Sequence, residues 1–207
     1  FDGIILGGDL CNQTGDTLIY KWIYDLFKAH NLSVHPISGN HDTSSLLADV
    51  FGLQNYLTNG ALYYKILIGQ VPCLLLDTSS GSMDAAQWRW IEKEVATSPF
   101  AHQHIFMHHP PVICHSKHME PKYMFREMEA FKSLCEKYSH KTFHIITGHY
   151  HIEKTVIHKN MYVYVSPSTY VQIDPDSTSF QMMHPHIGYR MLLIEGDGSV
   201  NTHALYL

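Results

Sequence analysis

Apolar residues in this chain alternate between short continuous runs and longer stretches with helical spacing. Between Asp16 and His30 they recur three or four positions apart, which predicts an amphipathic helix with Asp16 at its N-cap or in its first turn. Further helices are predicted over 43–51, 84–97 and 124–138, and Ser82 is the expected cap of the helix over 84–97. Strands are predicted over 2–6, 33–37, 62–68, 71–76, 102–107, 142–147, 153–158, 161–165, 187–194 and 200–206.

The order of these elements predicts an α/β fold. Strands and helices alternate at first, whereas the last third is rich in strands, and Gly69-Gln70 has the form of a tight hairpin turn. The 207 residues contain no repeat and no linker, so we expect one domain over 1–207. Two mixed sheets face to face, with helices outside, satisfy this pattern as a four-layer α-β-β-α sandwich.

Four polar motifs follow four of the strand-like runs. They are Gly8-Asp9, Gly39-Asn40-His41-Asp42, His108-His109-Pro110 and Gly148-His149-Tyr150-His151. Strand ends that each deliver an oxygen or imidazole ligand indicate one metal site at the edge of a sheet. This ligand set suits Mn, Fe or Zn rather than Ca or a thiolate-bound metal. Two such ions close together are a common means of hydrolysing phosphate esters.

The first two motifs offer distinct roles. The Asp9 carboxylate could bridge two cations, and Asn40 could offer its amide oxygen to one of them. His41 would then face the site as a proton donor rather than a ligand, with Asp42 holding its imidazole from behind. The alternative is that Asn40, His41 and Asp42 form a plain turn before the next helix.

The two histidine motifs differ in how clearly their spacing shows which residues face the metal. Pro110 restricts His109 to extended geometry, but spacing does not decide whether His108 or His109 faces the metal. His149 and His151 are two positions apart, and in an extended segment they would point to the same side, which favours a metal site. His184 and His186 could line the mouth of this site.

The composition indicates which classes of partner and which cellular compartment to expect. The formal net charge is −5, and the 14 lysines and arginines are scattered, so no nucleic-acid polymer is expected. The four cysteines form no C-x-x-C pair, which predicts free thiols in a reducing, cytoplasmic compartment. No apolar run approaches the roughly 18 residues of a membrane span, so no membrane partner is expected.

Taken together, the four motifs resemble the signature of the calcineurin-like metallophosphoesterase family, in order and over essentially the whole chain. Within that family the chain is most similar to the class III cyclic nucleotide phosphodiesterases. The finer likeness depends on 75–79 with 87–92, on 108–112, and on 166–169 with Gln172 and 188–190.

The resemblance implies a role for each residue. Asp9 would bridge two divalent metal ions, and Asn40, His108 and His149 would complete the second metal site. His151 would bind the first metal, and His41 would protonate the leaving oxygen. A metal-held hydroxide would attack phosphorus in line in a small phosphodiester, with 3',5'-cyclic AMP or a related cyclic nucleotide as the implied substrate.

The sequence also departs from the family. Its members carry an Asp-x-His motif on a strand upstream of Gly-Asp, and no such motif precedes Asp9. We therefore expect a domain lacking its N-terminal strand; the alternative is a protein without a proper first-metal site.

A second departure, at 114–118, leaves the substrate open. One alternative function is hydrolysis of another phosphate ester such as a glycerophosphodiester. Another is a metal-poor, non-catalytic binding protein of the same fold. Whether the chain pairs as a homodimer is not decided by the sequence.

Overall fold

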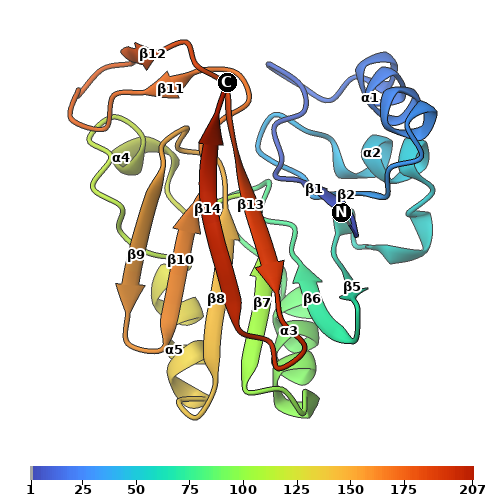
Figure 1. Ribbon diagram of the computed structural model, residues 1–207, viewed down its shortest axis with the longest axis vertical. Helices are drawn as coiled ribbons and strands as arrows, with labels where there is room; N and C mark the ends of the chain where they lie inside the picture. Colours follow the sequence, from blue (N-terminus) through green and yellow to red (C-terminus); the bar gives the residue numbers. More distant parts are fainter. Residues whose placement is uncertain (1) are drawn as a thin grey trace.

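The computed structural model describes residues 2–207, and its largest element is a six-stranded mixed sheet. Figure 1 shows this sheet with α3 (Ala85–Thr97) and α5 (Met128–Lys137) behind it. The strand order is β5-β6-β7-β8-β10-β9, and the three central pairings are parallel. The strands are β5 Tyr64–Ile68, β6 Val71–Leu75, β7 His102–Phe106, β8 Thr142–Thr147, β9 Lys154–His158 and β10 Met161–Val165.

The second strand layer consists of two separate ladders rather than one sheet. In the first ladder, β1 (Ile4–Leu6) pairs in parallel with β2 (Val34–Pro36). In the second, β13 (Gly188–Ile194) pairs antiparallel with β14 (Val200–Tyr206) and lies in front of the large sheet in Figure 1. The mixed α/β fold with outer helices is confirmed, but residues 2–207 do not form a continuous second sheet.

The large sheet buries both of its faces. Leu74 and Ile105 point to the back, where they join Phe131 of α5 in one apolar cluster. Leu75 and Phe106, the next residues along the same strands, point to the front and join a second cluster. This alternation is the period of two expected of a strand covered on both sides. The front cluster includes residues of α1 (Thr17–Ala29) and α2 (Ser44–Phe51), so it attaches the β1–β2 ladder to the sheet.

Most predicted elements are present, with two corrections among the helices. Asp16 caps α1 as predicted, accepting a hydrogen bond of 2.7 Å from the Leu18 amide. The cap of α3 is Asp84, which accepts from the Gln87 amide at 2.7 Å, and not Ser82, whose hydroxyl accepts instead from Arg126.

The predicted helix over 124–138 is shorter, because Met124 is extended and separates α5 from α4 (Glu120–Tyr123). Very short elements also escaped prediction, since two or three residues show no periodicity. They are a 3-10 helix at Gln54–Tyr56, β3 Leu57–Thr58, β11 Gln172–Ile173 and β12 Met182–His184. The predicted strand over 62–68 is present but divided at Tyr63 into β4 (Ala61–Leu62) and β5. Within the described chain, no helix is long and apolar enough to cross a membrane.

Three histidines lie between the large sheet and the β13–β14 hairpin. The His104 ring contacts the Gly198 carbonyl in the hairpin turn at 2.9 Å, and its side chain is 1% exposed. His102 Nδ1 contacts His144 Nε2 at 2.9 Å, and the rings of His104 and His144 stack. Burial, which disfavours the charged imidazolium, lowers the pKa of His104 and of His144 to about 4.

This stack makes stability depend on pH. Unfolded histidine takes up a proton near pH 6.5, whereas folded His104 takes it up near pH 4, so the unfolded state binds more protons between these values. The contribution of neutral His104 to the free energy of unfolding should be fully present above pH 6.5 and should be lost as the pH drops towards 4. His104→Gln removes the titration, so its loss of stability from pH 7.5 to 5 should be smaller than that of the wild type by about 1–2 kcal/mol.

Urea unfolding at the two pH values measures this difference. His140→Gln, at an exposed histidine, is the matched control and should keep the wild-type pH dependence. An unchanged pH dependence in His104→Gln would show that His104 does not titrate as its burial implies.

Candidate metal centre

Strand pairing brings three of the predicted ligands to one edge. His108 follows β7 and His149 follows β8, and because these strands are parallel neighbours their carboxyl ends share an edge. Asp9 follows β1, whose parallel partner β2 leads to Gly39 and Asn40. The front cluster holds this ladder against the sheet, which brings Asp9 beside the two histidines.

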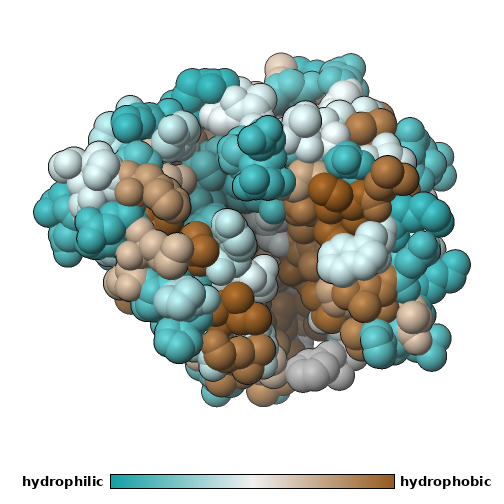
Figure 2. Space-filling view, turned by 90° about the horizontal axis from the view of Figure 1, so that it is seen from above, coloured by the Kyte–Doolittle hydropathy of each residue, from teal (hydrophilic) through white to brown (hydrophobic). Residues whose placement is uncertain are grey.

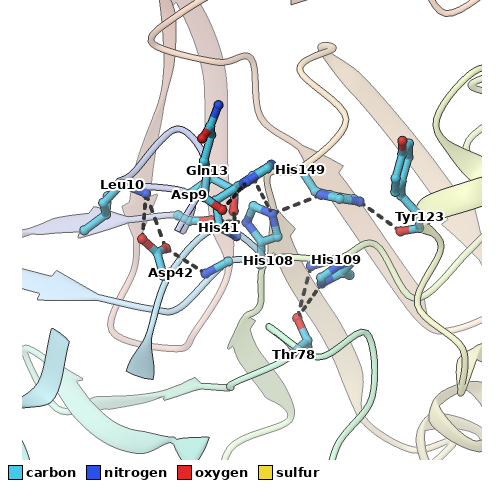
Figure 3. A network of polar contacts seen from close by, with 12 residues as sticks. Asp9, Leu10, Gln13, His41, Asp42, Thr78, His108, His109, Tyr123 and His149 are labelled. Atoms are coloured by element: carbon cyan, nitrogen blue, oxygen red, sulfur yellow. Dashed lines mark hydrogen bonds and ion pairs between the residues drawn. The ribbon is translucent and has the colours of Figure 1, made fainter. Parts of the chain in front are cut away.

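The ligand atoms converge closely. His108 Nε2 lies 3.2 Å from Asp9 Oδ2 and 3.0 Å from His149 Nδ1. One ligand atom from each of these three residues lies within 4.8 Å of the other two. Figure 3 shows the three side chains pointing toward one another at the centre of a network of polar contacts.

The remaining ring nitrogens of the two histidines fix their tautomers. His108 Nδ1 lies 2.8 Å from the Gly7 carbonyl, and His149 Nε2 lies 2.9 Å from the Tyr123 carbonyl. A carbonyl can only accept, so both of these nitrogens carry hydrogen. In neutral rings the other nitrogens therefore aim lone pairs at each other across 3.0 Å and at a carboxylate. A cation between them would satisfy all three groups, so the donor set fits a divalent metal.

Electrostatics agree with a need for positive charge at this point. Burial opposes ionisation of Asp9, but the hydrogen bond and charge of His108 prevail and hold the pKa of that carboxyl well below its usual range. Burial by itself would lower the pKa of His108, but the hydrogen bond and charge of Asp9 prevail and raise that pKa. The same burial lowers the pKa of His149, next to the positive His108. The pair can therefore hold one charge but not two.

The backbone is strained at the ligands. Asp9, His149 and His151 have φ of 56°, 67° and 52°, in the left-handed region that non-glycine residues rarely adopt. Such conformations persist only where the surroundings enforce them, and they concentrate at functional sites. They also correct a prediction: the segment from His149 to His151 is a turn and not extended. His151 lies outside the group of three, and its ring contacts the Val171 carbonyl at 3.1 Å.

The Asn40–Asp42 motif borders the same point, with one correction. The His41 amide donates to Asp9 Oδ1 at 2.9 Å, while the His41 ring contacts the Gln13 carbonyl at 3.2 Å. Asn40 is exposed beside them. Asp42 does not hold the His41 ring as predicted, because its carboxylate is already engaged elsewhere. It accepts from the Leu10 amide, the Gly39 amide and the Tyr20 hydroxyl.

The structure decides between the adjacent histidines. His108 enters the metal group, whereas His109 is buried against Thr78, whose hydroxyl lies 3.1 Å from His109 Nδ1. The His109 ring packs on His149 with 4.2 Å between centroids. Thr78 and the Tyr123 carbonyl were missed by sequence reasoning, since neither carries a metal-ligand signal. His184 pairs with Gln172 of β11, and its ring lies 5.3 Å from that of His186.

Comparison with known proteins gives the family. A family model described as calcineurin-like phosphoesterase matches residues 1–153. The chain belongs to this family. A probable cyclic nucleotide phosphodiesterase of Fibrobacter succinogenes is 34% identical over 179 residues, covering 86% of this chain and 69% of the relative. The 3',5'-cyclic adenosine monophosphate phosphodiesterase CpdA of Escherichia coli K12 is 25% identical, covering 98% and 73%.

Two further comparisons complete the picture. A probable glycerophosphodiester phosphodiesterase, GpdQ of Arcobacter nitrofigilis, is 26% identical over 100% of this chain and 78% of its own. A dimetal phosphatase from Danio rerio has the same fold, with a TM-score of 0.61 at 14% identity over 89% of this chain and 76% of its own. The chain is thus a hydrolytic metallophosphoesterase with a fold that implies divalent metal ions, and the non-catalytic binding protein is not favoured.

Gly39 provides a test of how tightly the centre is built. A Cβ on Gly39 would collide with Asp9 Oδ1 and the Asp9 amide and would lie 2.8 Å from His108 Cε1. Gly39→Ala should therefore displace both ligands and weaken divalent-ion binding on the order of tenfold or more, as does loss of an outer contact to a ligand. Isothermal titration with Mn²⁺ or Zn²⁺ measures the affinity.

The matched control lies two residues before Asp9. A Cβ on Gly7 would meet nothing within 4 Å, so Gly7→Ala should bind ions as the wild type does. Equal affinities in all three proteins would mean that Asp9 and His108 are not the ligands.

Proposed function

We propose that this enzyme hydrolyses a cyclic nucleotide phosphodiester, with 3',5'-cyclic AMP as the first substrate to test. The observation that carries the proposal is the convergence of Asp9, His108 and His149 with their lone pairs facing one another. Two relatives with names specifying cyclic nucleotide phosphodiesterases, at 34% and 25% identity, support the choice of substrate.

The proposed cation ligands are Asp9, Asn40, His108 and His149 for one ion, with Asp9 shared and His151 serving a second. Bound Mn, Fe or Zn ions would supply positive charge that polarises the phosphate and offsets the charge that grows during attack. Asp9 is suited to sharing because its Oδ2 faces His108 while its Oδ1 accepts from the His41 amide.

His41 is the proposed proton donor to the leaving oxygen. Its amide is tied to Asp9, so the residue is fixed beside the ligand group (Figure 3). The Gln13 carbonyl accepts from Nδ1, which leaves Nε2 without a partner among residues 2–207. A donor positioned in this way contributes by protonating an alcohol that would otherwise leave as a poor alkoxide.

A second candidate substrate is a glycerophosphodiester. The relative named GpdQ matches this chain over its full length at 26% identity, comparable to CpdA. Steady-state turnover of cyclic AMP and of glycerophosphoethanolamine by the same metal-loaded protein separates the two. We also propose a reducing compartment such as the cytoplasm, which is supported by four buried free thiols.

Asp9→Asn tests the ligand at the centre. The amide keeps the shape of the side chain but removes its charge, so ions should bind more weakly and hydrolysis should nearly vanish. Circular dichroism should show an intact fold, because Asp9 lies in a loop and outside both apolar clusters. Asp49→Asn, at an exposed aspartate of α2, is the control and should behave as the wild type. Near-normal ion binding and turnover in Asp9→Asn would refute the proposed centre.

His41→Ala tests the proton donor separately. Because His41 is not a proposed ligand, ion content should not change, whereas kcat for substrates with alkoxide leaving groups should fall on the order of 10² to 10⁴. Activated aryl esters need little protonation and should lose much less. The measurement is kcat against leaving-group pKa, with ion content by atomic absorption. A loss of ions, or equal loss for both kinds of substrate, would mean that His41 has another role.

A further inference from the structure

Two surface segments are attached directly to the histidines of the Gly148–His151 motif. The α4 segment, residues 115–124, receives the hydrogen bond from His149 Nε2 at the Tyr123 carbonyl, at 2.9 Å. The β11–β12 arm, residues 170–187, makes two hydrogen bonds to His151. The Val171 carbonyl accepts from the His151 ring at 3.1 Å, and the Ile173 amide donates to the His151 carbonyl at 3.0 Å. Each segment is therefore fixed to a different predicted ligand.

The two segments are also joined to each other beyond the metal centre. The Lys117 amide donates to the Pro175 carbonyl at 2.8 Å, and the Lys117 ammonium pairs with Asp176 at 3.0 Å. His118 Nδ1 lies 3.4 Å from the Thr178 carbonyl. Seen from above in Figure 2, the surface is hollowed between the side that carries α1 and the side that carries this arm.

Three aromatic rings meet where the segments join. The His118 ring lies 6.2 Å from that of Tyr123 and 6.4 Å from that of Phe180, edge to face in both cases. Tyr123 is 46% exposed and Phe180 is 59% exposed, and neither belongs to an apolar cluster of the core. We call Tyr123, His118 and Phe180 the aromatic trio. The folded chain leaves the Tyr123 and Phe180 rings exposed, and Figure 3 shows Tyr123 next to His149 of the metal centre.

We propose that the aromatic trio is the subsite that receives a flat aromatic group of the substrate, namely the nucleobase of a nucleotide phosphodiester. This inference rests on the proposed function and deepens it by naming the part of the substrate that the enzyme recognises. The phosphate would lie at Asp9, His108 and His149, and the base would stack on Tyr123 or Phe180. Every base has an aromatic face, so stacking favours nucleotides as a class and discriminates little among bases.

The anchoring predicts how the subsite acts. Tyr123 holds His149 through its main-chain carbonyl, which a side-chain substitution leaves in place. A change of the Tyr123 or Phe180 ring should therefore alter substrate binding without moving the metal ligands. The binding of an aliphatic phosphodiester, which has no ring to stack, should not change.

Kinetics of Tyr123→Leu and Phe180→Leu test this expectation. Each should raise KM for cyclic AMP on the order of 5- to 100-fold, the effect of losing one stacked base, with little change in kcat. Kinetics on glycerophosphoethanolamine should not change. Tyr123→Phe and Phe180→Tyr keep a ring and should retain the wild-type KM. Trp22→Leu, at an aromatic residue of α1 that is 65% exposed, is the matched control and should have no effect.

A binding measurement separates this inference from the proposed function. The Mn²⁺-loaded chain is titrated calorimetrically with AMP and with glycerol 3-phosphate, and no turnover is needed. Phe180→Leu should weaken AMP binding by the same factor and leave glycerol 3-phosphate binding unchanged. No AMP binding by the wild type, equal weakening for both ligands, or no weakening would overturn the subsite. If no phosphodiester is turned over but Phe180→Leu weakens the binding of AMP alone, the proposed function fails and the subsite stands.

Discussion

The site depends on one contact, the 3.0 Å approach of His108 Nε2 to His149 Nδ1 beside the Asp9 carboxylate. Two backbone carbonyls accept from the outer nitrogens of these rings, so in neutral rings the inner nitrogens have no hydrogen to share. An arrangement that places two lone pairs and a negative charge together is unfavourable in a buried site without a cation. The fold therefore specifies a metal centre through its main chain as much as through its ligand side chains.

Regular elements and their order could be predicted because the sheet is buried on both faces. Strand runs such as 142–147 and 71–76 are largely apolar and nearly all of their residues are buried, and the cap at Asp16 follows from local hydrogen bonding alone. What failed was decided by tertiary contacts. Ser82 is a good cap by type, yet Arg126 engages it and leaves the role to Asp84. The split of the second strand layer likewise depends on which strands meet in space.

The same division applies to the site. Residue types and order identified Asp9, His149 and one of the pair His108 and His109, because strand ends of parallel neighbours converge, and the resemblance to the family selected His108. Conformation could not be derived in the same way: His149 and His151 occupy left-handed turns, so the rule of alternating sides did not hold for them. Asp42 was assigned to the wrong partner because its carboxylate is consumed by the Leu10 and Gly39 amides, which no sequence pattern reveals.

Mutual support explains how so short a ladder can position a metal ligand. β1 and β2 contribute three residues each, too few to hold Asp9 rigidly by themselves. Asp42 ties the loop after β1 to the loop after β2, and Tyr20 of α1 donates to the same carboxylate. The His108 ring then spans from the Gly7 carbonyl to the Asp9 carboxylate, so the large sheet itself holds that loop. A cation bound to Asp9, His108 and His149 would thus connect the ladder to the sheet and stabilise the front half of the fold, as ligands do when they bind only the native state.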